Sequence, residues 1–300
     1  MYDVIIIGAG PAGLSAAIYS RRFLLKTLII GQLMGGLLTT THTVENWPGE
    51  KSILGRDLMK KIEEHARSFG AEIKNDQVTE LKKTSKGFSI TTDESKYETK
   101  SVIISTGTIH RHLGVPGEGE YAGRGVSYCA TCDGIFFKNK IIAVVGGSDS
   151  AVKEALMLTE YAKKVYIIYR KEKLRAEPVS IERVNKKIKE GIIEVIYNTN
   201  ITKINGDGEK IKSLSLDAGK ELPIEGLFID IGLIPQNDLA KSIGVKLNDK
   251  DEIITDKQSK TNVLGIFGAG DCTDSIFKQA ITGSAQGVIA AFSAYEYTNS

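Results

Sequence analysis

The 300-residue sequence is poor in cysteine, has little net charge and contains no long apolar run. Its three cysteines are too few for a secreted disulfide scaffold, and one close pair plus one leftover fits a reducing compartment. A membrane span needs roughly 20 consecutive apolar residues, and no segment approaches that length. The net charge of +2 offers no polyelectrolyte signature for nucleic acid. We therefore expect a cytoplasmic protein with neither a membrane nor a nucleic acid as partner.

A signal peptide is not expected either. The first apolar run, Val4–Ile7, follows Met1–Asp3, whereas a signal peptide has a positively charged start and a longer apolar core. Charged residues make up 25% of the chain and apolar residues 41%, which is ordinary for a globular enzyme. The length is sufficient for two domains, each with its own core.

One supersecondary pattern begins the chain. Val4–Ile7 predicts a short buried strand, because it is apolar, β-branched and followed directly by glycines. A glycine-rich turn, Gly8–Gly13, leads into a helix predicted over residues 12–23. Thr27–Ile30 predicts the next strand. Together these segments form a βαβ unit.

The same pattern returns in the middle of the chain. Ile141–Val145 predicts a strand, Gly146–Ser148 a turn, residues 150–161 a helix and Val165–Tyr169 the following strand. Alternating runs such as Gly87–Thr92 indicate antiparallel strands beside each parallel sheet. We therefore predict an α/β fold with two Rossmann-like, doubly wound nucleotide-binding domains.

Between the two turns lies a C-x-x-C pair, Cys129 and Cys132, followed by Asp133. Such a pair can cycle between dithiol and disulfide, or supply half of a metal site. A structural zinc site needs four ligands, and only Cys272 and four histidines without ligand spacing remain. We therefore expect no metal. Two nucleotide turns flanking a thiol pair suggest an electron relay from nicotinamide to flavin to disulfide. The histidines are His42, His65, His110 and His112.

The first turn has the spacing of a dinucleotide-binding loop. Gly8 allows the tight bend, Gly10 lets the backbone approach a pyrophosphate, and Gly13 lets the helix pack close to the strand. An acidic residue usually ends the second strand and binds the adenosine ribose, whereas this chain has Gln32 there. The residues expected to contact the dinucleotide are Gly8, Gly10, Pro11, Ala12, Gly13 and Gln32.

Two later stretches favour FAD at this site. Ile103–Gly107 predicts a strand that ends in a small-residue turn containing Thr106 and Gly107. Gly265–Asp271 predicts a strand that leads through Gly270 to a carboxylate. The Asp271 carboxylate is well placed to bind a ribityl hydroxyl.

Taken in order, these motifs resemble the low-molecular-weight thioredoxin reductases of bacteria and archaea. The resemblance covers essentially the whole chain and implies a discontinuous FAD domain at residues 1–110 and 238–300. It also implies an inserted NAD(P)H domain at 111–237 that carries the cysteines. The matching segments are Gly8–Gly13, Glu45–Gly49, Thr106–Gly107, Cys129–Gly134, Gly268–Asp271 and Lys278–Ala280.

The resemblance also implies roles for single residues. Cys132 would face the flavin, Cys129 would attack the substrate disulfide, and Asp133 would act as general acid and base. Where the family often has Gln after the paired glycines, this chain has Leu37. The residues implied to contact FAD are Thr39, Thr40, Asn46, Asp271, Gln279 and Ala280.

The second turn resembles the nicotinamide-binding turn of that family. Ser148 occupies the position of the middle glycine, where a Cβ hinders close approach to a pyrophosphate. Basic residues after the next strand suit the 2′-phosphate of NADPH, although NADH remains possible. Tyr169 replaces the family's His and Lys171 its second Arg. The residues expected at this site are Gly146, Gly147, Ser148, Asp149, Ser150, Arg170, Lys171 and Arg175.

The leading hypothesis is therefore a thioredoxin-disulfide reductase that uses NADPH and FAD, and the resemblance implies a homodimer. Two alternatives stay open because the nicotinamide motif is altered. One is a flavin-dependent dithiol oxidase that passes electrons to oxygen. The other is a disulfide reductase fed by ferredoxin or another carrier.

Overall fold

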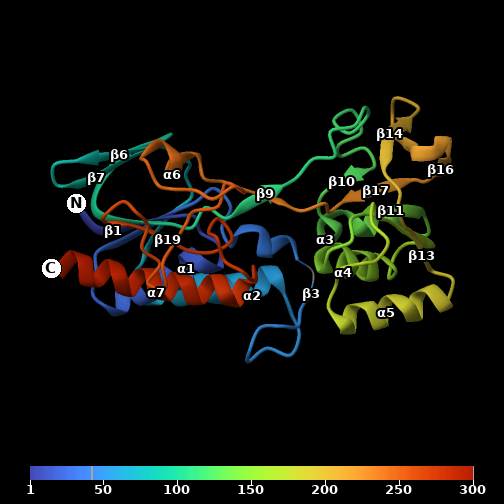
Figure 1. The fold of residues 1–300 in the computed structure, drawn as a ribbon. Helices are drawn as coiled ribbons and strands as arrows, with labels where there is room; N and C mark the ends of the chain where they lie inside the picture. Colours follow the sequence, from blue (N-terminus) through green and yellow to red (C-terminus); the bar gives the residue numbers. More distant parts are fainter. Residues whose placement is uncertain (42, 300) are drawn as a thin grey trace. The chain divides into compact units, whose positions relative to one another are not determined.

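The structure is a computed structural model that describes residues 1–41 and 43–299. His42, one of the four histidines considered above, lies outside them. The chain divides into two compact units, the first formed by Met1–Ile109 with Pro235–Ser300 and the second by His110–Ile234 (Figure 1). The second unit is thus an insertion in the first.

The first unit is built on a mostly parallel sheet with strand order β5-β2-β1-β8-β7-β6, to which β19 adds beside β8. Strands β5, β2, β1, β8 and β19 run parallel, and the β6–β7 hairpin adds two antiparallel strands. The strands are β1 (Tyr2–Ile7), β2 (Thr27–Ile30), β5 (Glu72–Lys74), β6 (Val78–Thr84), β7 (Gly87–Thr92), β8 (Lys96–Ile104) and β19 (Ile266–Gly268).

Both faces of this sheet are covered, which explains the continuous apolar run of β1. Val4 and Ile6 belong to one buried cluster together with residues of the helices α1 (Pro11–Arg22), α2 (Gly55–Ser68) and α7 (Ala280–Asn299). Ile5 and Ile7 belong to another cluster on the opposite face. The three helices lie side by side beneath the sheet (Figure 1).

Short elements complete the first unit and the two chain crossings. They are η1 (Gly36–Thr40), β3 (Thr43–Val44), β4 (Ile53–Leu54), β9 (Thr108–His110), β18 (Leu233–Pro235) and α6 (Asp238–Ser242). Within residues 1–41 and 43–299, no helix combines the length and apolar character that a membrane crossing requires.

The second unit contains a parallel sheet with strand order β10-β17-β11-β12-β13. A small antiparallel sheet, β14-β15-β16, packs beside it. The strands are β10 (Val126–Ser127), β11 (Ile141–Val145), β12 (Lys164–Ile168), β13 (Ile193–Ile196), β14 (Ile201–Gly206), β15 (Ile211–Leu216), β16 (Glu221–Pro223) and β17 (Gly226–Ile229).

The helices of this unit cover the other face of its parallel sheet. Ile142 and Val144 of β11 face helix residues such as Ala155, while Ala143 and Val145 face the antiparallel sheet. The helical elements are α3 (Ala130–Asp133), η2 (Gly134–Phe137), α4 (Asp149–Leu158), α5 (Pro178–Lys189) and η3 (Asp217–Gly219). The predicted class, two Rossmann-like α/β folds, is confirmed.

Candidate redox and nucleotide-binding sites

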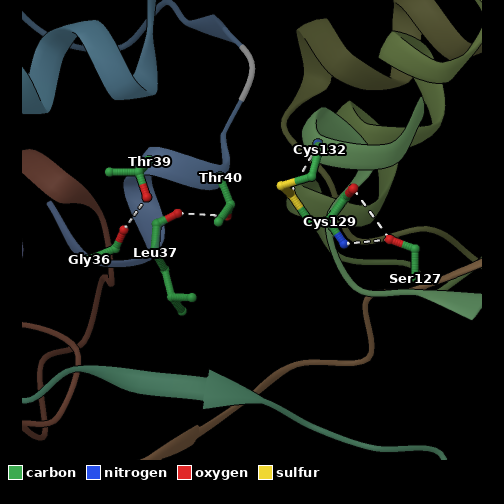
Figure 2. Close-up of a disulfide and its surroundings, with 7 residues drawn as sticks. All are labelled: Gly36, Leu37, Thr39, Thr40, Ser127, Cys129 and Cys132. Atoms are coloured by element: carbon green, nitrogen blue, oxygen red, sulfur yellow. Dashed lines mark hydrogen bonds between the residues drawn. A yellow bond between two sulfur atoms is a disulfide. The ribbon is translucent and has the colours of Figure 1, made fainter. Parts of the chain in front are cut away.

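The two cysteines of the C-x-x-C motif form a disulfide. Cys129 is the N-cap residue of α3, so one helical turn carries the chain from Cys129 to Cys132 and leaves their Cα atoms 5.3 Å apart. The backbone N–H of Cys129 donates to Ser127 Oγ at 3.0 Å, which ties the start of the turn to β10 (Figure 2). Cys132 is exposed and Cys129 is half-buried. The motif is therefore held by the sheet edge and open to a reaction partner.

Asp133 closes the same turn. Its backbone N–H donates to the carbonyl oxygen of Cys129 at 3.1 Å, and its side chain is half-buried. Ser127 ends β10 and pairs with Phe228 of β17, which in turn pairs with Val144 of β11. The disulfide therefore lies at the carboxyl edge of the parallel sheet, where ligands of doubly wound folds bind.

The second glycine turn lies at this same edge. Gly146 has φ +149°, and a Cβ there would lie 1.9 Å from the carbonyl oxygen of Asp230. Ser148 is the N-cap of α4, and its Oγ accepts the N–H of Ala151 at 3.4 Å. Asp149 Oδ1 accepts the N–H of Glu177 at 2.9 Å. The serine at the middle-glycine position therefore caps the helix itself.

Tyr169 joins the basic segment to this turn. A Cβ on Gly147 would lie 2.5 Å from the Tyr169 ring, so glycine is needed for the ring to pack there. Arg175 Nε donates to the Tyr169 hydroxyl at 3.1 Å, and the Arg175 N–H donates to the Gly147 carbonyl at 2.7 Å. Arg170 and Lys171 are exposed. Arg175 is thus anchored beside the turn, and Tyr169 is an anchor that the sequence reasoning interpreted only as a lost histidine.

The first glycine turn is built differently. A Cβ on Gly8 would lie 2.1 Å from the Ser105 carbonyl oxygen, and a Cβ on Gly13 would lie 1.9 Å from the Gly8 carbonyl oxygen. Both positions therefore need glycine for close backbone packing. A Cβ on Gly10 would meet nothing nearer than 3.8 Å. Gly10 is the N-cap of α1 without a side-chain cap, and Pro11 and Ala12 follow in the helix. This turn fits a dinucleotide pyrophosphate, because there is space beside Gly10 and no side chain caps the start of α1.

Several residues expected at the flavin lie around α7 and η1. Asn46 Nδ2 donates to Gln279 Oε1 at 3.0 Å, which brings together two expected residues 233 positions apart. The hydroxyls of Thr39 and Thr40 donate to the carbonyls of Gly36 and Leu37 (Figure 2). Ala280 begins α7. Gln32 Nε2 donates to Gln77 Oε1 at 2.8 Å, so the structure gives Gln32 a protein partner.

The turn after β19 carries the expected carboxylate. Burial raises the pKa of Asp271, and Lys278 opposes that rise. Lys278 Nζ donates to the Asp271 carbonyl at 2.8 Å. Gly270 has φ +84° and its N–H donates to Gln286 Oε1 at 2.9 Å. A half-buried carboxylate in a glycine turn suits a hydroxyl ligand, because a hydroxyl can donate to it.

Two more expected positions lie next to this turn. The Thr106 hydroxyl donates to the Gln236 carbonyl at 2.7 Å, and Gly107 has φ +66° with open space around its Cα. Cys272 is fully buried, and burial raises the pKa of its thiol. The Cys272 thiol therefore packs as a buried group and is disfavoured as a thiolate. Within residues 1–41 and 43–299, no group of His, Cys, Asp and Glu could hold a metal ion.

The sequence reasoning missed a cluster of buried acids beside the disulfide. Glu154 of α4 and Asp230, which follows β17, each have one buried carboxylate oxygen without a hydrogen-bond partner among residues 1–41 and 43–299. Burial, followed by the nearby charge of Asp230, raises the pKa of Glu154 to about 8. Neither position stands out in the sequence, because each carries a single acid in an otherwise ordinary element.

The fold and these sites define a class of protein. Two glycine turns at the carboxyl edges of parallel sheets, with a disulfide beside one of them, are the parts of a dinucleotide-dependent oxidoreductase that acts on disulfides. The model of the pyridine nucleotide-disulphide oxidoreductase family matches residues 2–287. The chain therefore belongs to the pyridine nucleotide-disulphide oxidoreductase family. This membership implies a flavin and a nicotinamide cofactor.

Individual relatives narrow the comparison to thioredoxin reductases, which confirms the resemblance seen in the sequence. The chain is 43% identical to the thioredoxin reductase of Listeria innocua over 303 residues, covering 99% of this chain and 94% of the relative. The crystal structure of Lactococcus lactis thioredoxin reductase (FR conformation) matches with a TM-score of 0.95 and 40% identity over 100% of this chain and 99% of that one. The T. acidophilum thioredoxin reductase matches with a TM-score of 0.94 and 40% identity, with the same coverage.

Proposed function

We propose that this chain is a thioredoxin-disulfide reductase that passes electrons from NADPH through FAD and the Cys129–Cys132 pair to a thioredoxin-like protein disulfide. The observation that carries the proposal is the Cys129–Cys132 disulfide at the carboxyl edge of the second sheet, with Asp133 in the same turn. FAD would lie in the first unit and NADPH in the second. When bound, the flavin would carry the electron pair between the nicotinamide and the disulfide.

The thiol chemistry then follows from the two cysteines. In the reduced enzyme the Cys129 thiolate attacks one sulfur of the partner disulfide, which forms a mixed disulfide and releases the partner's other sulfur as a thiolate. Asp133 donates a proton to that leaving group. The Cys132 thiolate next attacks Cys129 Sγ, which re-forms the Cys129–Cys132 bond and releases the partner's second thiol. The enzyme dithiol is oxidised and the partner disulfide is reduced.

The preference for NADPH rests on the basic segment beside the second turn. Arg175 is held by Tyr169 and Gly147, while Arg170 and Lys171 are exposed for a 2′-phosphate. An acid that would select the ribose of NADH is absent from the positions that follow β12 directly, Tyr169, Arg170 and Lys171.

Anaerobic stopped-flow reduction of the flavin-loaded protein tests the donor. We expect fast bleaching of the flavin absorbance by NADPH and slower bleaching by NADH. Reoxidation by an oxidised bacterial thioredoxin should follow, and Cys129→Ser should abolish it. Absence of bleaching by either nucleotide would reject NADPH as the donor and direct the search to a ferredoxin-type carrier or to oxygen-linked dithiol oxidation.

The similarity to thioredoxin reductases also supports the proposal that the chain forms a homodimer in the cytoplasm. Light scattering coupled to size-exclusion chromatography should give twice the chain mass of 32.6 kDa. A monomeric mass would reject this part of the proposal.

A further inference from the structure

Three titratable side chains of the second unit each have a buried polar atom that lacks a hydrogen-bond partner among the described residues. These atoms are Glu154 Oε2 in the middle of α4, Asp230 Oδ2 after β17 and His110 Nδ1 at the end of β9. Leaving a buried polar atom unpaired costs about 1–3 kcal/mol, so such atoms are uncommon without a role. The proposed electron route uses none of the three.

The three side chains form one electrostatic cluster. Asp230 acts on both of its neighbours: its charge raises the pKa of Glu154 and opposes the burial that lowers the pKa of His110. Burial raises the pKa of Asp230 itself, and hydrogen bonds from the Ser150 hydroxyl and the Gly232 N–H partly oppose that rise. Since two neighbouring carboxylates resist double ionisation, the pair retains a proton at neutral pH, and Glu154 holds it.

One contact links this cluster to the disulfide. The N–H of Ala130, the residue directly after Cys129, hydrogen-bonds to the Glu154 carboxyl. Ala130 is 1% exposed, and α3 packs on α4. The following η2 also rests on α4, because a Cβ on Gly134 would lie 3.0 Å from Leu158 Cδ2. The turn that carries both cysteines therefore packs on α4.

We propose that Glu154 is a positioning residue for the Cys129–Cys132 couple: its carboxyl holds the Ala130 N–H and, by gaining or losing its proton, changes how readily the neighbouring thiols ionise. This proposal rests on the disulfide-reductase function proposed above. A protonated Glu154 is neutral and leaves the thiols unaffected. An ionised Glu154 places a negative charge beside Cys129 and disfavours its thiolate, so the thiol pKa rises as Glu154 titrates.

The other charged groups nearby are accounted for. Asp230, which follows β17, faces Glu154, and His110 at the end of β9 faces Asp230 and His112. Asp133 lies on α3 itself. Lys153, the neighbour of Glu154 on α4, is engaged by Asp149 at 2.6 Å and by Glu177 at 3.2 Å. Both of these ion pairs are made with carboxylates other than that of Glu154, so Lys153 does not offset the ionised form of Glu154 within the described contacts.

The test is the pH profile of thiol alkylation in the FAD-loaded protein. The disulfide is reduced with dithiothreitol, the reductant is removed anaerobically, and iodoacetamide adducts on the peptide carrying Cys129 and Cys132 are measured between pH 6 and pH 10. In Glu154→Gln the Ala130 N–H keeps an acceptor but the charge is lost. We expect the pH at which alkylation reaches half of its maximal rate to lie about one unit lower in this variant than in the wild type. The pH profile of the variant should fit a single ionisation.

Two further variants separate position from charge. Glu160→Gln removes an exposed carboxylate just beyond α4 and should leave the profile unchanged. Glu154→Ala removes the acceptor as well, so its alkylation rate should differ from that of Glu154→Gln at every pH. Superimposable profiles of the wild type and folded Glu154→Gln would overturn the proposal. Because this assay contains neither NADPH nor thioredoxin, its outcome does not depend on which donor or partner the enzyme uses.

Discussion

Replacing Glu154 by Gln should stabilise the protein, and the gain should grow with pH. The pKa of Glu154 lies at about 8 in the folded protein, against an ordinary value of 4.5. Between these two values the unfolded chain has released a proton that the folded state still binds, so the wild type loses stability as pH rises. The loss reaches about 3 kcal/mol at pH 7 and levels off at about 5 kcal/mol above pH 8. These are upper figures, because the residue as a whole remains partly accessible to water.

Urea unfolding followed by circular dichroism measures this difference directly. Glu154→Gln and the wild type should have equal free energies of unfolding near pH 4 and should diverge steadily up to about pH 8. The exposed Glu160→Gln variant is the matched control, since it makes the same chemical change six residues further along the chain. If the Glu154→Gln and wild-type curves stay parallel from pH 4 to pH 9, the buried proton inferred here does not exist, and the alkylation argument fails with it.

The remaining predictions concern the disulfide and the two turns. Cys132→Ser should retain flavin binding but lose at least 10³-fold in thioredoxin reduction, measured with NADPH under steady-state conditions, and activity within tenfold of the wild type would contradict the relay. Gly13→Ala forces a Cβ to 1.9 Å from the Gly8 carbonyl, so the purified protein should contain much less flavin and unfold at a lower temperature. Arg175→Ala should raise the KM for NADPH about tenfold and leave that for NADH nearly unchanged, and equal changes for both would remove Arg175 from the 2′-phosphate site. Tyr169→Phe deletes only the hydroxyl that Arg175 Nε contacts, so its effect on the KM for NADPH should be in the same direction and smaller.

The fold could be predicted because its signals are local. Continuous β-branched runs such as Val4–Ile7 and Ile141–Val145 are required wherever a parallel sheet is covered on both faces, and the glycines that follow them mark the turns. Strand ends were predicted less well: Val165–Tyr169 became Lys164–Ile168, because Tyr169 leaves the sheet to pack on Gly147. Such a shift depends on a tertiary contact that periodicity does not report.

The buried acids show a second limit of sequence reasoning. Glu154 lies next to Lys153 in a helix that also contains Asp149, so the composition of the helix indicates a solvated face. Only the packing of α3 on α4 and the end of β17 buries its carboxyl. Desolvation of a single acid is a property of the assembled fold, and a pattern of residue types contains no signal for it. In the same way, the hydrogen bond between Asn46 and Gln279 joins positions that only the resemblance to a family had associated.

The two glycine turns share a motif but differ in how the helix start is satisfied, and the difference matches the roles proposed for them. In the first turn Gly10 offers no side-chain cap, so the N–H groups at the start of α1 depend on a ligand or water for partners. A cofactor that fills this place is bound tightly, as a resident flavin must be. In the second turn Ser148 already accepts the N–H of Ala151, and a nucleotide gains less by binding there. Weaker binding suits a nicotinamide donor that has to leave after every hydride transfer. Ser148→Gly should therefore lower the Kd for NADP⁺, and a higher Kd in a titration would show that the serine contributes to nucleotide binding instead of competing with it.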